Sequence, residues 1–115
     1  MPHIILEHSS NILEKDNFSD FFSDAHDMLV EKISANINAC KSRAISCNNY
    51  YICDGNINNS FIHITLKIMP GRTKEQKEEV SVSLFNLLKS FFKRSLEDQN
   101  LQISVEIVDL AFYKK

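Results

Sequence analysis

The chain has 115 residues, of which 43% are hydrophobic and 24% charged, and its formal net charge is −2. These values predict a single globular domain over residues 1–115, because a chain of this length cannot build a second core. They provide no basic surface for nucleic acid, and no apolar stretch approaches the roughly 20 residues of a membrane span, so we expect neither nucleic acid nor a membrane as a partner.

The N-terminal segment lacks the features of a secretory signal. Its apolar run is short, no basic residue precedes it, and Glu7 interrupts it. We therefore expect a cytoplasmic protein whose cysteines, Cys40, Cys47 and Cys53, stay reduced. Neither these cysteines nor the four histidines show metal-ligand spacing, so no metal site is predicted.

The first half of the chain predicts a strand, a helix and an extended segment. Residues 2–8 are nearly all apolar, which favours a strand, and a polar break follows at 9–11. The next segment predicts a helix, because its apolar residues recur at helical spacing: Phe18, Phe21, Phe22, Ala25, Met28, Leu29 and Ile33. Residues 39–53 are predicted to be extended, and Asp54-Gly55 then indicates a turn.

The second half repeats this order. Phe61 to Met69 alternates apolar and polar residues and predicts a strand. Thr73, with Gln76 three residues later, makes a capping box that begins a helix. Apolar residues continue at helical spacing through that helix: Val80, Leu84, Leu87, Leu88, Phe91 and Leu96. A last strand has Leu101, Ile103, Val105 and Ile107 directed inward.

The element order predicts an α+β fold made of two β-α-β units, over residues 2–53 and 60–110. Crossover connections are right-handed, so both helices are expected on one face of a four-stranded sheet. The other face carries a mixed set of side chains, namely His63, Thr65, Lys67, Ser104 and Glu106. Such a face fits contact with water and contact with other subunits equally well.

Pro2 is the first candidate for chemistry. The initiator methionine is normally removed before a residue as small as proline, which leaves a secondary amine. A chain-terminal amine has a pKa of roughly 8, and burial or a nearby cation lowers that pKa further. A neutral amine near pH 7 can accept a proton and return it elsewhere, which is general acid–base catalysis. Taken alone, Met-Pro is also a common start of a chain.

Three basic residues are candidates for binding an anion. Arg72 lies at the predicted strand-to-helix turn, where free N–H groups favour anions and a guanidinium fits a carboxylate. Lys41 and Arg43 alternate along an extended segment and so project to one side. Each of these observations also fits an ordinary cation in water, and the residues alone leave both interpretations open.

Six short segments carry a resemblance to a known family. They are Met-Pro-His-Ile-Ile-Leu-Glu at the start, Ser-Asn-Ile at 10–12, Lys-Ser-Arg at 41–43, Asp-Gly at 54–55, Phe-Ile-His-Ile-Thr-Leu-Lys-Ile at 61–68 and Gly-Arg at 71–72. As a set and in this order, they resemble the 5-carboxymethyl-2-hydroxymuconate Δ-isomerase family of the tautomerase superfamily. The likeness covers nearly the whole chain.

The resemblance implies a β-α-β repeat fold, a homotrimer, and active sites near subunit boundaries without metal or organic cofactor. It implies an isomerase of aromatic-compound degradation, a keto–enol tautomerase that converts a small carboxylated, unsaturated 2-hydroxy acid to its 2-oxo isomer. Carried over by position, Pro2 would be the proton shuttle and Arg72 would bind a substrate carboxylate. Lys41 and Arg43 would supply further positive charge.

The sequence departs from the family pattern at two places. Lysine stands at position 41 where the family has arginine, and lysine lacks the bidentate fork. The chain also ends at residues 111–115 where the family continues, which predicts a less covered pocket or subunit edge. Two alternatives follow: a tautomerase relative with another substrate, such as a halogenated acrylate, and a non-catalytic trimeric protein that serves in binding or as a scaffold.

Overall fold

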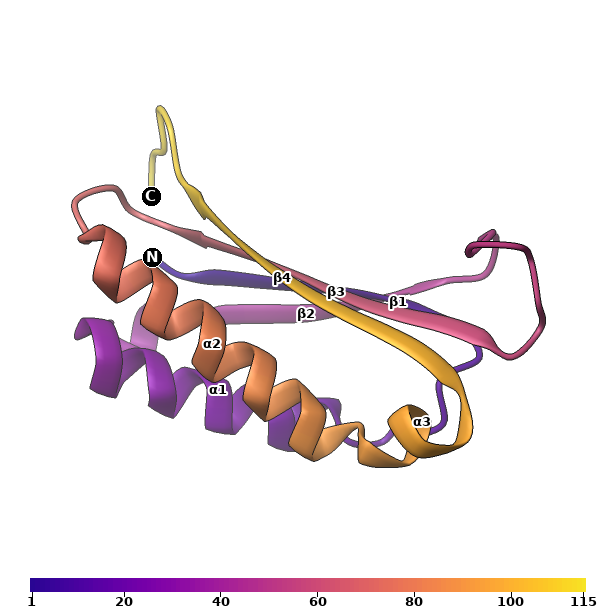
Figure 1. The fold of residues 1–115 in the computed structure, drawn as a ribbon. Coiled ribbons are helices and arrows are strands. Elements are labelled where there is room, and N and C mark those ends of the chain that lie inside the picture. Colours follow the sequence, from indigo (N-terminus) through magenta and orange to yellow (C-terminus); the bar gives the residue numbers. More distant parts are fainter.

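The computed structural model describes residues 1–115 and contains one four-stranded sheet with helices on one face (Figure 1). In chain order the elements are β1 (His3–Ser9), α1 (Phe18–Ile33), a 3-10 helix (Ile37–Ala39), β2 (Lys41–Cys47), β3 (Asn59–Ile68), α2 (Lys74–Phe91), α3 (Lys93–Asp98) and β4 (Asn100–Asp109). The strand order is β2-β1-β3-β4, in which β1 and β3 are antiparallel and each edge strand is parallel to its neighbour. The predicted α+β fold is confirmed.

The core lies between the sheet and the helix pair. Strand side chains alternate between faces, so the even-numbered residues of β1 and β3 point toward the helices. Ile4, Leu6 and Ile64 are completely buried there, and the apolar stripes of α1 and α2 pack against them. Burial of this apolar surface is the main stabilising contribution to the fold. None of the helices is both long and apolar enough to cross a lipid bilayer.

The other face of the sheet carries the polar side chains that the alternation predicts. His63 lies at its centre, with Nδ1 2.6 Å from Ser104 Oγ and Nε2 2.9 Å from Glu106 Oε1. Thr65 Oγ1 donates to the same carboxylate oxygen at 3.3 Å. In the single chain no helix covers this network, which is open to solvent or to another subunit (Figure 1).

The helix that begins at Thr73 is shorter than predicted. The capping box is present, because Thr73 Oγ1 accepts from the Gln76 N–H and the Gln76 side chain accepts from the Thr73 N–H. The expectation of one helix through Leu96 is wrong, since Phe92 adopts φ −116° and separates α2 from α3. The reason is packing: the Phe92 ring is fully buried, with its centroid 6.0 Å from that of Phe21.

The extended segment is also shorter than residues 39–53. Only Lys41–Cys47 forms a strand, and the 3-10 helix precedes it because the Asn36 side chain accepts a hydrogen bond from the Asn38 N–H. The predicted turn is present at Gly55, which has φ +82°. A Cβ at that position would meet the Tyr51 ring at 2.7 Å, but this exposed ring can move aside, so the backbone angle is what favours glycine.

Candidate active site

One end of the sheet collects segments that are far apart in the sequence. His3 at the start of β1 pairs with Lys41 at the start of β2 and with Lys67 near the end of β3. The turn after β3 carries Arg72, and the C-terminal tail, residues 110–115, returns to the same end after β4 (Figure 1). The strand register therefore surrounds the N-terminus with residues from several segments.

Five basic side chains lie around the start of the chain, and their charges act on the Met1 amine or on the His3 ring. We call them the basic cluster: Lys41, Arg43, Lys67, Arg72 and Lys115. Burial, followed by the charges of Lys115 and Arg72, lowers the pKa of the Met1 amino group. Burial and then Arg43 lower the pKa of the His3 imidazole. None of the five forms an ion pair with a carboxylate. Their combined positive charge favours an anion as the ligand.

Pro2 is buried at the entrance to β1. Its carbonyl accepts a hydrogen bond from the Lys41 N–H at 3.0 Å, which extends the parallel ladder by one step beyond the strand. With Met1 attached, the Pro2 nitrogen is a peptide nitrogen and has no basic lone pair. Removal of Met1 would create an amine that stays attached to the sheet through the carbonyl of the same residue.

Arg72 is half-buried and has a structural contact of its own. Its guanidinium donates to the carbonyl of Ile33, the last residue of α1, at 3.0 Å. A cation at a helix C-terminus is favourable, because the free carbonyls there carry partial negative charge. The helix start that follows has fewer free N–H groups than the sequence suggested, since the capping box uses those of Thr73 and Gln76. The guanidinium is therefore the stronger anion-binding element of this turn.

Arg43 and Lys41 project from β2 to the same side as His3, as their spacing predicts. Arg43 donates to His3 Nδ1 at 3.2 Å, and Lys41 Nζ donates to the Ala39 carbonyl at 3.3 Å. Both basic side chains are exposed, so their remaining donors are available to a ligand.

Sequence reasoning missed the contribution of the C-terminal tail. Tyr113 Oη lies 2.8 Å from His3 Nε2, and Lys115 is the charge that most lowers the pKa of the Met1 amine. The tail therefore reaches the start of β1, while the less covered pocket or subunit edge stays a prediction. No local pattern in residues 110–115 indicates this path. Lys67, by contrast, could have been found from the strand alternation that placed it on the open face.

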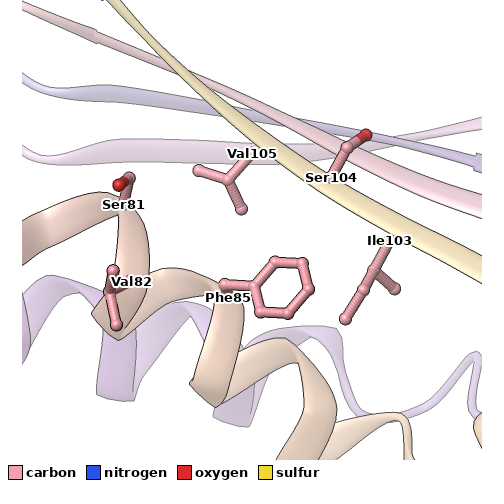
Figure 2. Close-up of a pocket in the computed structure, with 6 residues that line it drawn as sticks. All are labelled: Ser81, Val82, Phe85, Ile103, Ser104 and Val105. Atoms are coloured by element: carbon pink, nitrogen blue, oxygen red, sulfur yellow. The ribbon is translucent and has the colours of Figure 1, made fainter. Parts of the chain in front are cut away.

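The two hollows of the chain lie elsewhere. The larger, of about 390 Å³, is an apolar groove between α2 and β4 lined by Ser81, Val82, Phe85, Ile103, Ser104 and Val105. Figure 2 shows the Phe85 ring filling the space between the two elements, whereas Ser104 points away from it. The smaller hollow, of about 280 Å³, lies in the loop around Tyr51. Neither is lined by a residue of the basic cluster, so a single chain does not enclose a ligand at the N-terminus.

Comparison with known proteins decides the family. The family model described as 5-carboxymethyl-2-hydroxymuconate isomerase matches residues 2–114. The chain belongs to this family. The protein is thus an isomerase, as the sequence resemblance implied. A 5-carboxymethyl-2-hydroxymuconate Delta-isomerase of Escherichia coli is 31% identical over 110 residues, which are 96% of this chain and 87% of that protein.

Solved structures show the same fold. The crystal structure of a 5-carboxymethyl-2-hydroxymuconate isomerase from Deinococcus radiodurans R1 matches with a TM-score of 0.89 and 24% identity, over 99% of this chain and 88% of that chain. A symmetric trimer of fused 4-OT matches with a TM-score of 0.74 and 14% identity, over 94% and 85% of the two chains. These likenesses show that the isomerase shares the fold of both proteins.

Proposed function

We propose that the protein is a cofactor-independent keto–enol tautomerase of a carboxylated, unsaturated 2-hydroxy acid such as 5-carboxymethyl-2-hydroxymuconate. In this proposal Pro2, freed of Met1, is the proton shuttle. The single observation that carries the proposal is the position of the N-terminus within the basic cluster. Membership in the isomerase family supports the substrate class.

The surroundings of Pro2 favour a neutral amine. The burial and the Lys115 and Arg72 charges that lower the pKa of the Met1 amine would lower that of an amine one residue further into the strand in the same direction. Pro2 is itself buried, so desolvation would add to the effect. An amine that is unprotonated near pH 7 is able to act as a base without first losing a proton to solvent.

A single group, the Pro2 nitrogen, is enough to carry the proton through the whole reaction. The Pro2 nitrogen takes the proton of the 2-hydroxyl group, the C–O bond becomes a carbonyl, and the conjugated double bonds shift along the chain. The same nitrogen then returns the proton to a carbon of that chain, so no electrons enter or leave. Negative charge grows on the substrate oxygens during the transfer, and fixed cations stabilise it.

Arg72, Arg43 and Lys41 would bind the substrate carboxylates. A guanidinium offers two parallel donors to a carboxylate, which orients the substrate as well as attracting it. Lys41 supplies charge without that geometry, so we assign orientation mainly to the two arginines. The exposed positions of Lys41 and Arg43 support these roles.

We also propose a homotrimer with active sites near the subunit boundaries. The basic cluster of the single chain encloses no cavity, and both hollows of the chain are lined by other residues. A neighbouring subunit would supply the missing wall and exclude water. The similar fold of the fused 4-OT symmetric trimer supports this assembly.

Two measurements test the proposal. Intact mass of native protein should be lower than the full chain by one methionine residue. Pro2→Ala should lower kcat for ketonisation of 5-carboxymethyl-2-hydroxymuconate by about 100-fold or more, which is the usual contribution of a general acid–base group. Protein that keeps Met1 serves as the matched control and should be equally inactive. Wild-type rates in Pro2→Ala would contradict the assignment of Pro2.

A panel of substrates separates the alternatives. If the protein turns over halogenated acrylates and not the 2-hydroxy acid, Pro2 still acts on the proton but the substrate is a different one. A protein that retains Met1 in the cell and turns over none of the panel would instead be a binding or scaffold protein.

A further inference from the structure

The C-terminal tail is held against the start of β1 at a defined position. The Leu110 N–H donates to the Ile68 carbonyl at 2.7 Å, which continues the pairing of β4 with β3 into the tail. Phe112 then adopts φ +52°, a left-handed conformation that turns the chain back toward the N-terminus (Figure 1). The Tyr113 ring meets the His3 ring edge-on, with their centroids 5.7 Å apart. These contacts place Tyr113 beside the basic cluster.

The donors and acceptors of this contact have only one consistent arrangement. A guanidinium can only donate, so the Arg43 bond requires an unprotonated Nδ1 on His3. A neutral imidazole then carries its hydrogen on Nε2, and that N–H donates to Tyr113 Oη at 2.8 Å. Burial, Arg43 and Lys41 lower the pKa of His3, which agrees with a neutral ring near pH 7. The hydroxyl hydrogen of Tyr113 is therefore left unused.

We infer that the tail is part of the substrate site: Tyr113 donates its free hydroxyl hydrogen to a substrate carboxylate, and Lys115 adds charge beside the same group. The inference rests on the proposed function and adds to it the residues that select the substrate.

The chemistry of the substrate indicates which carboxylate the tail contacts. 5-Carboxymethyl-2-hydroxymuconate carries three carboxylates, one more than 2-hydroxymuconate. Arg72 and Arg43 lie on different elements and provide one fork for each of two carboxylates. Lys41 supplies charge without a fork, so a third carboxylate needs a further directed donor; Tyr113 provides it, and Lys115 adds charge. The tail thus selects for the additional carboxymethyl group.

The test compares two variants with matched controls. Tyr113→Phe removes the hydroxyl group and keeps the ring, and Lys115→Gln removes the charge. Tyr51→Phe and Lys114→Gln are the controls. Tyr51 is 79% exposed in a distant loop, and Lys114 is next to Lys115 in the chain but is not among the charges that lower the pKa of Met1 or His3. Each protein is assayed with 5-carboxymethyl-2-hydroxymuconate and with 2-hydroxymuconate.

We expect Tyr113→Phe and Lys115→Gln each to lower kcat/KM for the tricarboxylate about tenfold, mainly through KM, because each removes one charge-assisted contact. The fall in kcat/KM with the dicarboxylate should be clearly smaller, since only the effect of the Lys115 charge on the N-terminal amine is common to both substrates, and neither control should move either value. Equal losses with both substrates would indicate a merely structural role and overturn the inference. So would values equal to the controls.

A binding measurement separates this inference from the proposed function. Calorimetry with propane-1,2,3-tricarboxylate and with adipate needs no turnover, and the same variants should weaken only the tricarboxylate. If wild-type protein turns over neither 2-hydroxy acid yet shows this binding pattern, the proposed reaction fails and the tail site stands. If it turns over the acids while all four variants bind alike, the reaction stands and the tail site fails.

Discussion

Arg72 belongs to the candidate site and also holds the turn after β3 to the end of α1. Its replacement should therefore lower the stability of the protein as well as affect the site. The guanidinium donates to the Ile33 carbonyl at 3.0 Å and is half-buried between the turn and the end of α1. The Arg72→Ala substitution removes this donor and leaves a helix-terminal carbonyl without that partner. It also removes a cation from the negative end of the helix dipole. The substitution should therefore weaken the protein before any substrate is added.

The size of the loss follows from these contacts. A hydrogen bond from a charged group contributes about 1.5–3 kcal/mol when it is shielded, and less when water can replace it. For a half-buried pair we expect the free energy of unfolding to fall by about 1–2 kcal/mol, out of the roughly 5–15 kcal/mol typical of a domain. Arg72→Lys keeps the charge and one donor direction, so it should recover about half of the loss.

Urea unfolding followed by far-UV circular dichroism measures this loss. All variants are compared at one protomer concentration, because subunit association would make apparent stability depend on concentration. Arg94→Ala is the control: the Arg94 side chain is 70% exposed and lies 3.9 Å from Asp98, a surface pair whose loss should cost less than about 0.5 kcal/mol. An Arg72→Ala protein as stable as Arg94→Ala would refute the assignment of a structural contact to Arg72.

Two further predictions concern the core and the open face. Phe92→Ala should cost about 3–5 kcal/mol in the same urea assay, because the ring is fully buried, whereas Phe112→Ala, whose ring is fully exposed, should cost less than about 0.5 kcal/mol. The hydrogen bond from His63 lowers the pKa of Glu106, so its stabilisation is present above the ordinary carboxyl pKa and is lost as the pH falls through the lowered value. In an NMR titration, His63→Gln should move the Glu106 pKa back up toward its ordinary range, and an unchanged titration would contradict this cause.

The strands and their faces could be predicted because their periodicity is local. Alternation in residues 61–68 is set by the pleat of a single strand, and the structure buries Ile62, Ile64 and Leu66 on the predicted side. The capping box at Thr73 is equally local, because both of its hydrogen bonds lie within four residues. Such features need no knowledge of the partner segments.

The end of α2 could not be predicted from local pattern. The apolar spacing continues past Phe92 to Leu96, and helix propensity offers no reason to stop. Phe92 leaves the helical conformation because its ring packs against Phe18 and Phe21 from α1, a contact between residues more than 70 positions apart. Tertiary packing overrides the local pattern there.

The candidate site was predictable in part for the same reason. Lys41 and Arg43 share a side through strand alternation, and Arg72 follows from its position at a turn. The roles proposed for Tyr113 and Lys115 depend on the path of a tail that has no periodic pattern. The left-handed turn at Phe112 that brings them back is unusual for a residue with a side chain, and nothing in the sequence marks it.

The bond between the Pro2 carbonyl and the Lys41 N–H has a consequence for how this family can diverge. Main-chain atoms alone make it, so the location of Pro2 is inherited from the sheet and is independent of which side chain occupies position 41. Exchange of lysine for arginine at that position would therefore alter the attraction for ligands and leave Pro2 where it is. If Pro2 acts as proposed, new substrate preferences can arise around an unmoved proton carrier, one surface residue at a time.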